Sequence, residues 1–410
     1  MSNLPLYVGE RTKAVHAGER PDPDTRASVP NIVMSTTYTV DADTGFSVEG
    51  LEENDPWIYT RWGNPTIRQL EDKLSALENA ECAVAFASGM AAILALLLHT
   101  LKAGDHAIVS DVAYAALSEM TNEMIPALNI AITKVDTSDL ASVEASLQPN
   151  TRLVYIETPC NPLLRLTDIE AVAKLAHKVG ARLAVDSTFA TPVATKPLQL
   201  GADFVIHSLT KYLGGHGDAL GGAIVGSKAD LLPLRKKTAI RLGGTISPFN
   251  AWLIMRGMAT LPLRMRAHEE NALKVAAYLE QHPKISRVFY PGLLSHPQHA
   301  LAQRQMRNFS GMLTFQTVCD GRSAASVFAK SLKIIHYAVS LGHHRSLLFY
   351  LDSAALMQTT FRFDTPAQLA SWQAFAGNGI FRFSVGLEDA DDIIADLDAA
   401  LREERHKLLS

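Results

Sequence analysis

The chain has 410 residues, of which 47% are hydrophobic and 20% charged, the balance of a globular protein long enough for two or three domains. Its net charge of −4 lacks the basic surplus that a nucleic-acid-binding protein normally carries, so no nucleic-acid partner is expected. Cys82, Cys160 and Cys319 are too few and too far apart for a disulfide framework or a zinc site, which favours a cytoplasmic location.

Residues 1–60 contain several prolines and acidic residues but few segments with a regular hydrophobic period. We expect them to form an extended arm rather than a packed domain. An arm of that length indicates contact with a neighbouring subunit, and therefore a homo-oligomer. The first residues, MSNLPLYVGERTKAVHAGE, lack the basic and then apolar layout of a signal peptide.

The longest apolar stretch, AVAFASGMAAILALLLHTL, covers residues 83–101 and is interrupted by Ser88 and Gly89. The interruption makes it a poor membrane span, so we expect no membrane insertion. A strand that runs through a turn into a buried helix fits the same residues better.

Between residues 80 and 226, short apolar runs alternate with segments of helical length. Six runs are typical of strands, namely CAVAFAS, HAIVS, IAITKV, RLVYIET, RLAVDS and DFVIHS, whereas DIEAVAKLAHKVG has helical spacing. This alternation predicts a mostly parallel sheet with helices on both faces, whose ligands gather at the carboxyl ends of the strands. We assign residues 61–247 to this large domain.

The pattern changes after residue 247. One long helical stretch, SPFNAWLIMRGMATLPLRMRAHEENALKVAAYLEQH, is followed by shorter segments, among them GMLTFQTV, GRSAASVFAKSL, GIFRFSVG and the charged DADDIIADLDAALREERHKL. Residues 248–410 are therefore predicted to form a linking helix and a smaller C-terminal α/β domain.

Ser88, Gly89 and Met90 form a small-residue turn between a predicted strand and a predicted helix. The amides at the start of a helix favour a phosphate, although an ordinary strand–helix turn has the same composition. Two other phosphate motifs fail. The chain has no Gly-Lys pair for a Walker A loop, and GGHGDALGG has Leu220 where a nicotinamide fingerprint requires its last glycine.

Two charged residues follow neighbouring runs of the predicted sheet. Asp186 ends RLAVD, where it is either a helix cap or the partner of a buried cation. Lys211 follows DFVIHSLT and precedes a glycine-rich segment, in the stretch HSLTKYLGGHGDALGG. An acid that keeps a pyridine nitrogen protonated and a lysine that binds an aldehyde are the two protein groups that pyridoxal phosphate requires.

The chain resembles the Cys/Met metabolism family of pyridoxal-phosphate enzymes, which includes methionine γ-lyase, cystathionine γ-lyase, cystathionine γ-synthase and the homoserine sulfhydrylases. The matching segments are YTRWGNPT, FASGMAAI, YIETPCNP, AVDSTFATP, HSLTKYLGGHGDALGG and FRFSVGLED, spread from residue 59 to residue 389. The resemblance implies the fold-type I transferase fold, an α/β fold with a large, mostly parallel seven-stranded sheet and a smaller C-terminal domain. It also implies a homotetramer built from dimers that share their active sites.

The resemblance also implies which residues hold the cofactor. Lys211 binds it as a Schiff base and moves protons, and Asp186 pairs with the ring nitrogen. Tyr114 stacks on the ring and acts as an acid or base, while Asn161 lies beside the ring hydroxyl. The phosphate is held by Gly89, Met90, Ser208 and Thr210 of the same chain and by Tyr59 and Arg61 of the adjacent subunit.

The substrate is an amino acid whose α-carboxylate the resemblance assigns to Arg382, with Ser340. An arginine offers the planar fork that matches a carboxylate. We expect a γ-lyase that acts on a methionine-like or homoserine-derived amino acid and releases a thiol or an oxyguanidine, as in canavanine. The alternatives are a γ-replacement enzyme (an O-acetyl- or O-succinylhomoserine sulfhydrylase or a cystathionine γ-synthase), then a cystathionine β-lyase, and a non-catalytic cofactor-binding regulator.

Three segments depart from the family's pattern. Ala116 stands where methionine lyases carry a cysteine, and TAIRLGGTISP replaces their Lys-Asp pair. His343, His344 and Arg345 follow SLG, where relatives have small residues and an acid. Adjacent histidines point apart in most backbones, which favours a role in the substrate pocket or at the surface over a metal site, and no metal is expected.

Overall fold

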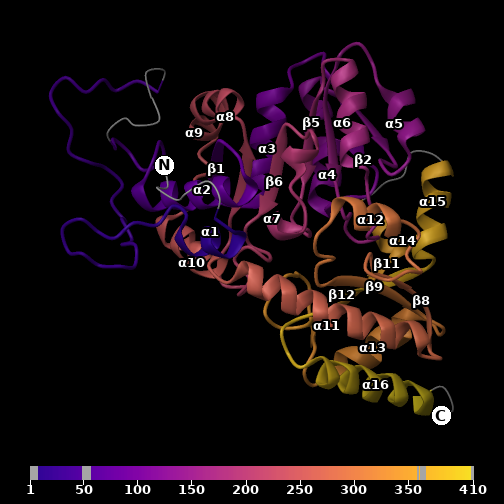
Figure 1. The fold of residues 1–410 in the computed structure, drawn as a ribbon. Coiled ribbons are helices and arrows are strands. Elements are labelled where there is room, and N and C mark those ends of the chain that lie inside the picture. Colours follow the sequence, from indigo (N-terminus) through magenta and orange to yellow (C-terminus); the bar gives the residue numbers. More distant parts are fainter. Residues whose placement is uncertain (1–7, 49–56, 358–359, 361–365, 408–410) are drawn as a thin grey trace.

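The computed structural model describes residues 8–48, 57–357, 360 and 366–407, which build a seven-stranded and a five-stranded sheet (Figure 1). The larger sheet has the order β1-β7-β6-β5-β4-β2-β3. Its strands are β1 (Cys82–Phe86), β2 (His106–Ser110), β3 (Ala131–Val135), β4 (Thr151–Glu157), β5 (Arg182–Asp186), β6 (Phe204–Ser208) and β7 (Gly222–Gly226).

The larger sheet is mostly parallel, as the sequence predicts. The six predicted runs form six of its strands, and β7 is an additional strand that lies antiparallel between β1 and β6. Because β5 and β6 are adjacent and parallel, Asp186 and the segment that leads to Lys211 leave the sheet at the same edge.

Alternate residues of the buried strands pack into cores on opposite faces of the larger sheet. Val84 belongs to a core with α3 (Gly89–Thr100), whereas Ala83 and Ala85 belong to a core with α2 (Pro65–Glu78). The apolar stretch of residues 83–101 is therefore a strand that leads into a buried helix, as expected. The other helical segments of this part are α1 (Glu10–His16), α4 (Ala115–Glu123), η1 (Pro126–Leu128), α5 (Leu140–Ser146), α6 (Ile169–Lys178), α7 (Thr191–Ala194), η2 (Pro197–Leu200), α8 (Lys228–Leu234), η3 (Arg235–Ala239) and α9 (Ile240–Leu242).

The stretch predicted as one linking helix is two helices. The first, α10 (Pro248–Met258), ends before Ala259, and α11 (Leu261–Gln281) begins with Pro262 in its first turn. A proline lacks the amide that would continue the preceding helix but fits the first turn of a new one. In Figure 1, α11 runs diagonally from beneath the larger sheet to the smaller one.

The smaller sheet has the order β10-β11-β12-β9-β8. Its core includes Phe315, Phe328 and Phe381, whose rings contact one another. Its strands are β8 (Ile285–Phe289), β9 (Met312–Thr317), β10 (His336–Tyr337), β11 (Leu347–Asp352) and β12 (Gly379–Ser384). The helices of this part are α12 (His299–Gln305), α13 (Gly321–Ser331), α14 (Ser353–Leu356), α15 (Pro366–Ala376) and α16 (Ala390–Lys407).

The described part of the N-terminal arm extends away from the sheets as the indigo trace in Figure 1. It is not wholly extended, because it contains the short helix α1, and a β-bridge joins Thr37 to Tyr59. Large apolar side chains of the arm face solvent in the single chain, among them Phe46, which is 79% exposed, and Met34, which is 60% exposed.

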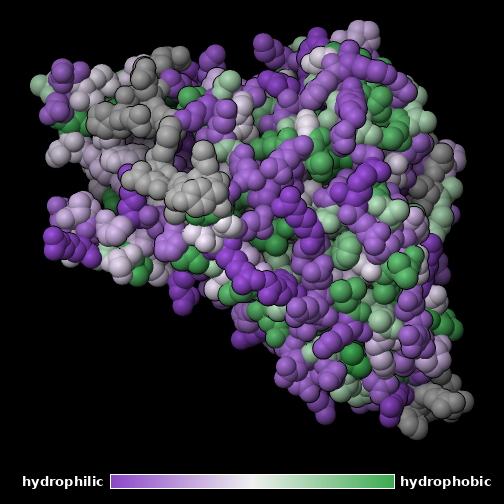
Figure 2. Space-filling model, viewed as in Figure 1, coloured by the Kyte–Doolittle hydropathy of each residue, from purple (hydrophilic) through white to green (hydrophobic). Residues whose placement is uncertain are grey.

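No helix among the described residues is long and apolar enough to cross a membrane. On the face drawn in Figure 2, hydrophilic residues prevail and hydrophobic ones occur in small groups between them.

A buried arginine, Arg264 of α11, ties the segment after Lys211 to the linking helices. Its guanidinium donates to the carbonyl oxygens of Tyr212 and Gly257, each at 2.8 Å, while its Nε donates to the Thr260 hydroxyl at 3.0 Å. A Cβ at Gly215, where φ is +74°, would lie 2.2 Å from the guanidinium, so this position requires glycine.

We expect Arg264→Leu to lower the free energy of unfolding by roughly 3 kcal/mol, because it leaves buried carbonyl groups without donors. Arg266→Leu is the matched control, since Arg266 is exposed two residues further along the same helix. Thermal melting checks the difference. Equal melting temperatures for the two variants would contradict a structural role for Arg264.

Candidate active site

A cavity of about 420 Å³ opens where the carboxyl ends of strands in the larger sheet meet the smaller sheet. A volume of that order suits a small ligand. The residues that line it are Ser88, Gly89, Met90, Ile93, Tyr114, Glu157, Asn161, Asp186, Thr188, Phe189, Ser208, Thr210, Lys211, Leu220, Val339, Ser340, Leu341, Phe349, Leu351 and Arg382. Of the residues that the sequence assigns to the site, Tyr59 and Arg61 are missing from this lining.

Two buried acids lie side by side at the floor of the cavity. Asp186 and Glu157 are register partners at the ends of β5 and β4. Asp186 accepts hydrogen bonds from the Tyr155 hydroxyl at 3.2 Å and from the Thr188 amide at 3.0 Å. Burial raises the pKa of both carboxyl groups, and the charge of Asp186 raises the pKa of Glu157 further. A cation placed beside Asp186 would offset the free-energy cost of burying its negative charge.

Lys211 follows β6, next to the strand that carries Asp186. Its Nζ lies 2.9 Å from the Ser340 Oγ, a neutral hydroxyl. Burial, and then the charge of Arg382, lowers the pKa of Lys211 to about 8. About a tenth of the amine is therefore unprotonated at pH 7, far more than for an ordinary lysine, and the unprotonated form is the one that acts as a nucleophile or a base.

Arg382 comes from the smaller sheet, on β12. Its guanidinium donates to the Asn161 Oδ1 and to the Ser340 carbonyl oxygen, each at 3.1 Å. Burial lowers the pKa of Arg382 to about 10, so the group stays charged at neutral pH. A buried cation that is bonded to neutral partners is suited to an incoming carboxylate.

Glu157 is the residue of the site that the sequence analysis misses. One carboxylate oxygen accepts from the Tyr114 amide at 2.8 Å, and the other accepts from the Asn161 amide at 2.7 Å. It thus fixes the backbone of two residues that the sequence assigns to the cofactor. Glu157 lies at the carboxyl end of the predicted strand RLVYIET. The corresponding position in the next run identified Asp186, so the same signal was available for Glu157.

The start of α3 offers a subsite for a phosphate. Ser88 caps the helix by accepting from the Ala91 amide at 3.1 Å, and the amides of Gly89 and Met90 belong to the first turn, which has no intrahelical acceptors. A Cβ on Gly89 would lie 3.2 Å from the Ser208 Cβ, so glycine keeps this subsite open. Thr210 also lines the cavity, but its hydroxyl exchanges hydrogen bonds with the backbone of Gly221, at 3.1 and 3.2 Å.

These residues fit pyridoxal phosphate. The helix start suits the phosphate, the buried carboxylate of Asp186 suits a protonated ring nitrogen, and the amine of Lys211 suits the aldehyde. Tyr114, which is 44% exposed, immediately precedes α4 and lines the same cavity.

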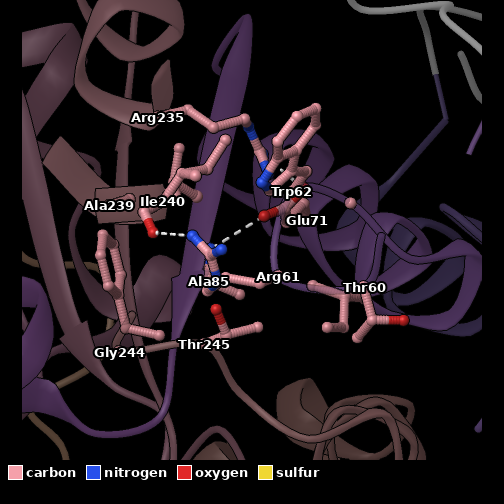
Figure 3. A pocket seen from close by; sticks show the side chains of 14 residues that line it. Thr60, Arg61, Trp62, Glu71, Ala85, Arg235, Ala239, Ile240, Gly244 and Thr245 are labelled. Carbon is pink, nitrogen blue, oxygen red and sulfur yellow. Dashed lines mark hydrogen bonds and ion pairs between the residues drawn. The ribbon is translucent and has the colours of Figure 1, made fainter. Parts of the chain in front are cut away.

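Tyr59 and Arg61 lie elsewhere in the chain. Arg61 lines a separate small pocket, where its guanidinium donates to the Ile240 carbonyl oxygen at 2.7 Å (Figure 3). In the same pocket, Arg235 forms an ion pair with Glu71 at 2.6 Å (Figure 3). Within one chain, therefore, Arg61 does not reach the cavity that contains Lys211.

The residues that depart from the family's pattern also lie outside the lining of the cavity. Ala116 is in the first turn of α4, while His343, His344 and Arg345 lie in the loop before β11. His343 nevertheless reaches the site indirectly, because its Nε2 lies 3.3 Å from the Ser340 Oγ.

Comparisons with known proteins identify the family of this chain. A family model described as Cys/Met metabolism PLP-dependent enzyme matches residues 11–402. The chain is 41% identical over 395 residues to the canavanine γ-lyase of Pseudomonas canavaninivorans, with 96% of each chain covered. It is also 41% identical over 393 residues to the cystathionine γ-synthase of Mycobacterium tuberculosis, with 96% of this chain and 97% of that one covered.

The fold agrees with a solved structure of the same group. The crystal structure of cystathionine γ-synthase from Xanthomonas oryzae pv. oryzae, in complex with aminoacrylate and cysteine, matches with a TM-score of 0.88 and 37% identity over 98% of this chain and 100% of that one. A lyase and a synthase are thus equally similar in sequence. The chain belongs to the Cys/Met metabolism family of pyridoxal-phosphate-dependent enzymes and is a γ-elimination or γ-replacement enzyme.

Proposed function

We propose that the protein is a γ-lyase that acts on a methionine-like amino acid with a small, uncharged γ-substituent. The observation that carries this proposal is the composition of the cavity wall. Apart from the assigned site residues, Glu157 and the hydroxyl residues Ser88 and Thr188, that wall is apolar and consists of Ile93, Phe189, Leu220, Val339, Leu341, Phe349 and Leu351. Such a wall favours a thioether over a charged group, because burying an unpaired charge is costly.

The ionisable side chains of the described lining all have proposed roles toward the cofactor or the α-carboxylate. They are Tyr114, Glu157, Asp186, Lys211 and Arg382. An oxyguanidine would need a further acid, and a succinyl group or the distal amino acid of cystathionine would need a further cation. The part of the wall that this chain contributes therefore supports a methylthio-like leaving group over that of canavanine.

The proposed reaction converts L-methionine and water into 2-oxobutanoate, ammonia and methanethiol. Bound pyridoxal phosphate supplies an electron sink for the negative charge that develops at the α-carbon. Arg382 orients the α-carboxylate, and Lys211 Nζ accepts the α-proton and then moves protons between the substrate carbons. Tyr114, at the rim of the cavity, donates the proton that the leaving sulfur requires.

γ-Replacement is the alternative, and the similarity to a cystathionine γ-synthase favours it. An O-acetylhomoserine substrate also carries an uncharged γ-substituent, so the apolar wall accepts it as well. The two reactions differ in whether an added thiol is required for turnover.

We also propose a homotetramer of dimers with shared active sites, located in the cytoplasm, in which residues 1–60 form an arm. Residues 61–247 and 248–410 form the two proposed domains. Exposed Phe46 and Met34 on the arm supply apolar surface for a second copy. In that assembly Tyr59 and Arg61 would reach the phosphate subsite of the neighbouring chain.

The test of the proposed function is a substrate panel of methionine, cystathionine, O-acetylhomoserine, O-succinylhomoserine and canavanine, assayed with and without an added thiol. We expect 2-oxobutanoate and methanethiol from methionine without a thiol, at a higher kcat/KM than for cystathionine or canavanine. Lys211→Ala is the inactive control, and it should also lose the visible absorption of the bound cofactor. Turnover that requires a thiol would overturn the lyase proposal.

Arg382→Leu is expected to raise KM for methionine by roughly 10- to 100-fold, since a charge-assisted pair is lost. The matched control substrate is 3-methylthiopropylamine, which lacks the α-carboxylate. Its binding, followed by the cofactor's absorption, should not weaken in the variant. Equal losses for the two ligands would show that Arg382 supports the cavity in general rather than binding the carboxylate.

A further inference from the structure

His343 forms the end of a hydrogen-bonded chain that begins at Lys211. The Lys211 Nζ lies 2.9 Å from the Ser340 Oγ, which in turn lies 3.3 Å from the His343 Nε2. Ser340 is held in a left-handed conformation, with φ at +81°, between the two groups. A serine hydroxyl has one proton to donate and lone pairs that accept. It can therefore accept a hydrogen bond from one nitrogen group while it donates its own proton to the other.

The glycine-rich segment after Lys211 makes room for this imidazole. A Cβ on Gly217, where φ is +70°, would lie 2.4 Å from the His343 Cε1. The loop is also fixed at the next residue, because the His344 amide donates to the Gly215 carbonyl oxygen at 2.9 Å and its carbonyl oxygen accepts from the Leu387 amide at 2.8 Å. The ring is therefore positioned by both neighbouring segments.

His343 lies between the cavity and the surface of the protein. Its side chain is half-buried, Ser340 on one side lines the cavity, and Arg345 is exposed two residues further on. The charged and titratable groups that face it are Lys211 and Asp218 from the lysine segment and His344 and Arg345 from its own loop. Burial, and then the charge of Lys211, lowers the pKa of His343, so the ring is neutral near pH 7 and can accept a proton.

We propose that His343 exchanges protons between Lys211 and solvent through the Ser340 hydroxyl. In the forward step, a proton leaves the Lys211 ammonium for the Ser340 Oγ while the hydroxyl proton moves to the His343 Nε2. The products are a neutral amine and an imidazolium, which then loses its proton to water. The reverse sequence recharges the lysine. This inference rests on the proposed role of Lys211 as the base at the α-carbon.

The relay gives Lys211 a route for protons that does not pass through the substrate. γ-Elimination removes protons from carbon and must deliver others to the leaving group and the product. A lysine that could not exchange its proton with solvent would return the same proton to the substrate. A histidine that merely braces the loop would leave proton exchange unchanged.

The experiment measures the exchange of the α-hydrogen of norleucine in D₂O by ¹H NMR with the purified holoenzyme. Norleucine has no leaving group, so exchange isolates proton movement. His343→Gln keeps a polar side chain but cannot titrate, and His344→Gln is the matched control in the same loop. We expect exchange to slow by about tenfold or more in His343→Gln, with norleucine binding unchanged, whereas His344→Gln behaves like the wild type.

Two further readouts separate a relay from a structural role. In the wild type, exchange should fall toward acidic pH as Lys211 becomes protonated, and fall more steeply below pH 6.5 as His343 becomes protonated and can no longer accept. The additional fall below pH 6.5 should disappear in His343→Gln. In cofactor-free protein, where Lys211 carries its charge, the Cε1–H NMR signal of His343, identified by its loss in the variant, should titrate below 6.5 in the wild type. It should titrate at a higher pH in cofactor-free Lys211→Ala, where the facing charge is gone. If glutamine loosens the loop, His343→Phe fills the ring's space and replaces it in every measurement.

The outcomes distinguish the inference from the function on which it rests. Equal exchange rates and pH profiles in the wild type and the variants would overturn the relay and leave the proposed function intact. An unchanged His343 titration in Lys211→Ala would do the same. A wild type that binds norleucine but exchanges none of its α-hydrogen would overturn both.

Discussion

The cavity depends on two charged groups of opposite sign that leave the larger sheet at the same buried edge. Asp186 ends β5, and Lys211 follows the adjacent parallel strand β6. Burial acts on them in opposite directions, because it raises the pKa of the carboxyl group and lowers that of the amine. A cofactor with a basic ring nitrogen and an aldehyde matches both shifts, since it places a cation beside the acid and reacts with the neutral amine.

The smaller sheet completes the site and adjusts its electrostatics. It brings Arg382 close enough to lower the pKa of Lys211, and the loop before β11 brings Ser340 within hydrogen-bond distance of the same amine. Two glycines of the lysine segment, Gly215 and Gly217, leave space for Arg264 and His343, respectively. The glycine-rich composition after the lysine thus serves the close approach of side chains from distant segments.

The sequence predicted this edge of the sheet correctly because it follows from local patterns. Short apolar runs located β5 and β6, and the polar residues after them placed Asp186 beside Lys211. Other features escaped for physical reasons. The glycines at both ends of GAIVG weaken the strand pattern of β7. The break between α10 and α11 was missed because the helical hydrophobic period continues across Pro262, so the period outweighed the proline.

Contacts between distant segments had no local signal. Ser340 lies 129 residues from Lys211 in the chain, and Glu157 acts through the amides of Tyr114 and Asn161, which a side-chain pattern does not report. The resemblance, in contrast, already assigned Tyr59 and Arg61 to the adjacent subunit. Arg61 lies apart from the cavity within one chain, and its role in the neighbouring site stays a prediction.

The pKa of Lys211 itself is the property that tests most directly whether burial keeps this amine ready to react. In cofactor-free protein carrying ¹³Cε-labelled lysine, the Lys211 signal is identified by its absence in Lys211→Ala and followed by NMR as the pH rises. We expect a midpoint near 8, and a higher midpoint in Arg382→Leu. A midpoint near the usual 10.5 would contradict the claim that burial and Arg382 keep this amine ready to react.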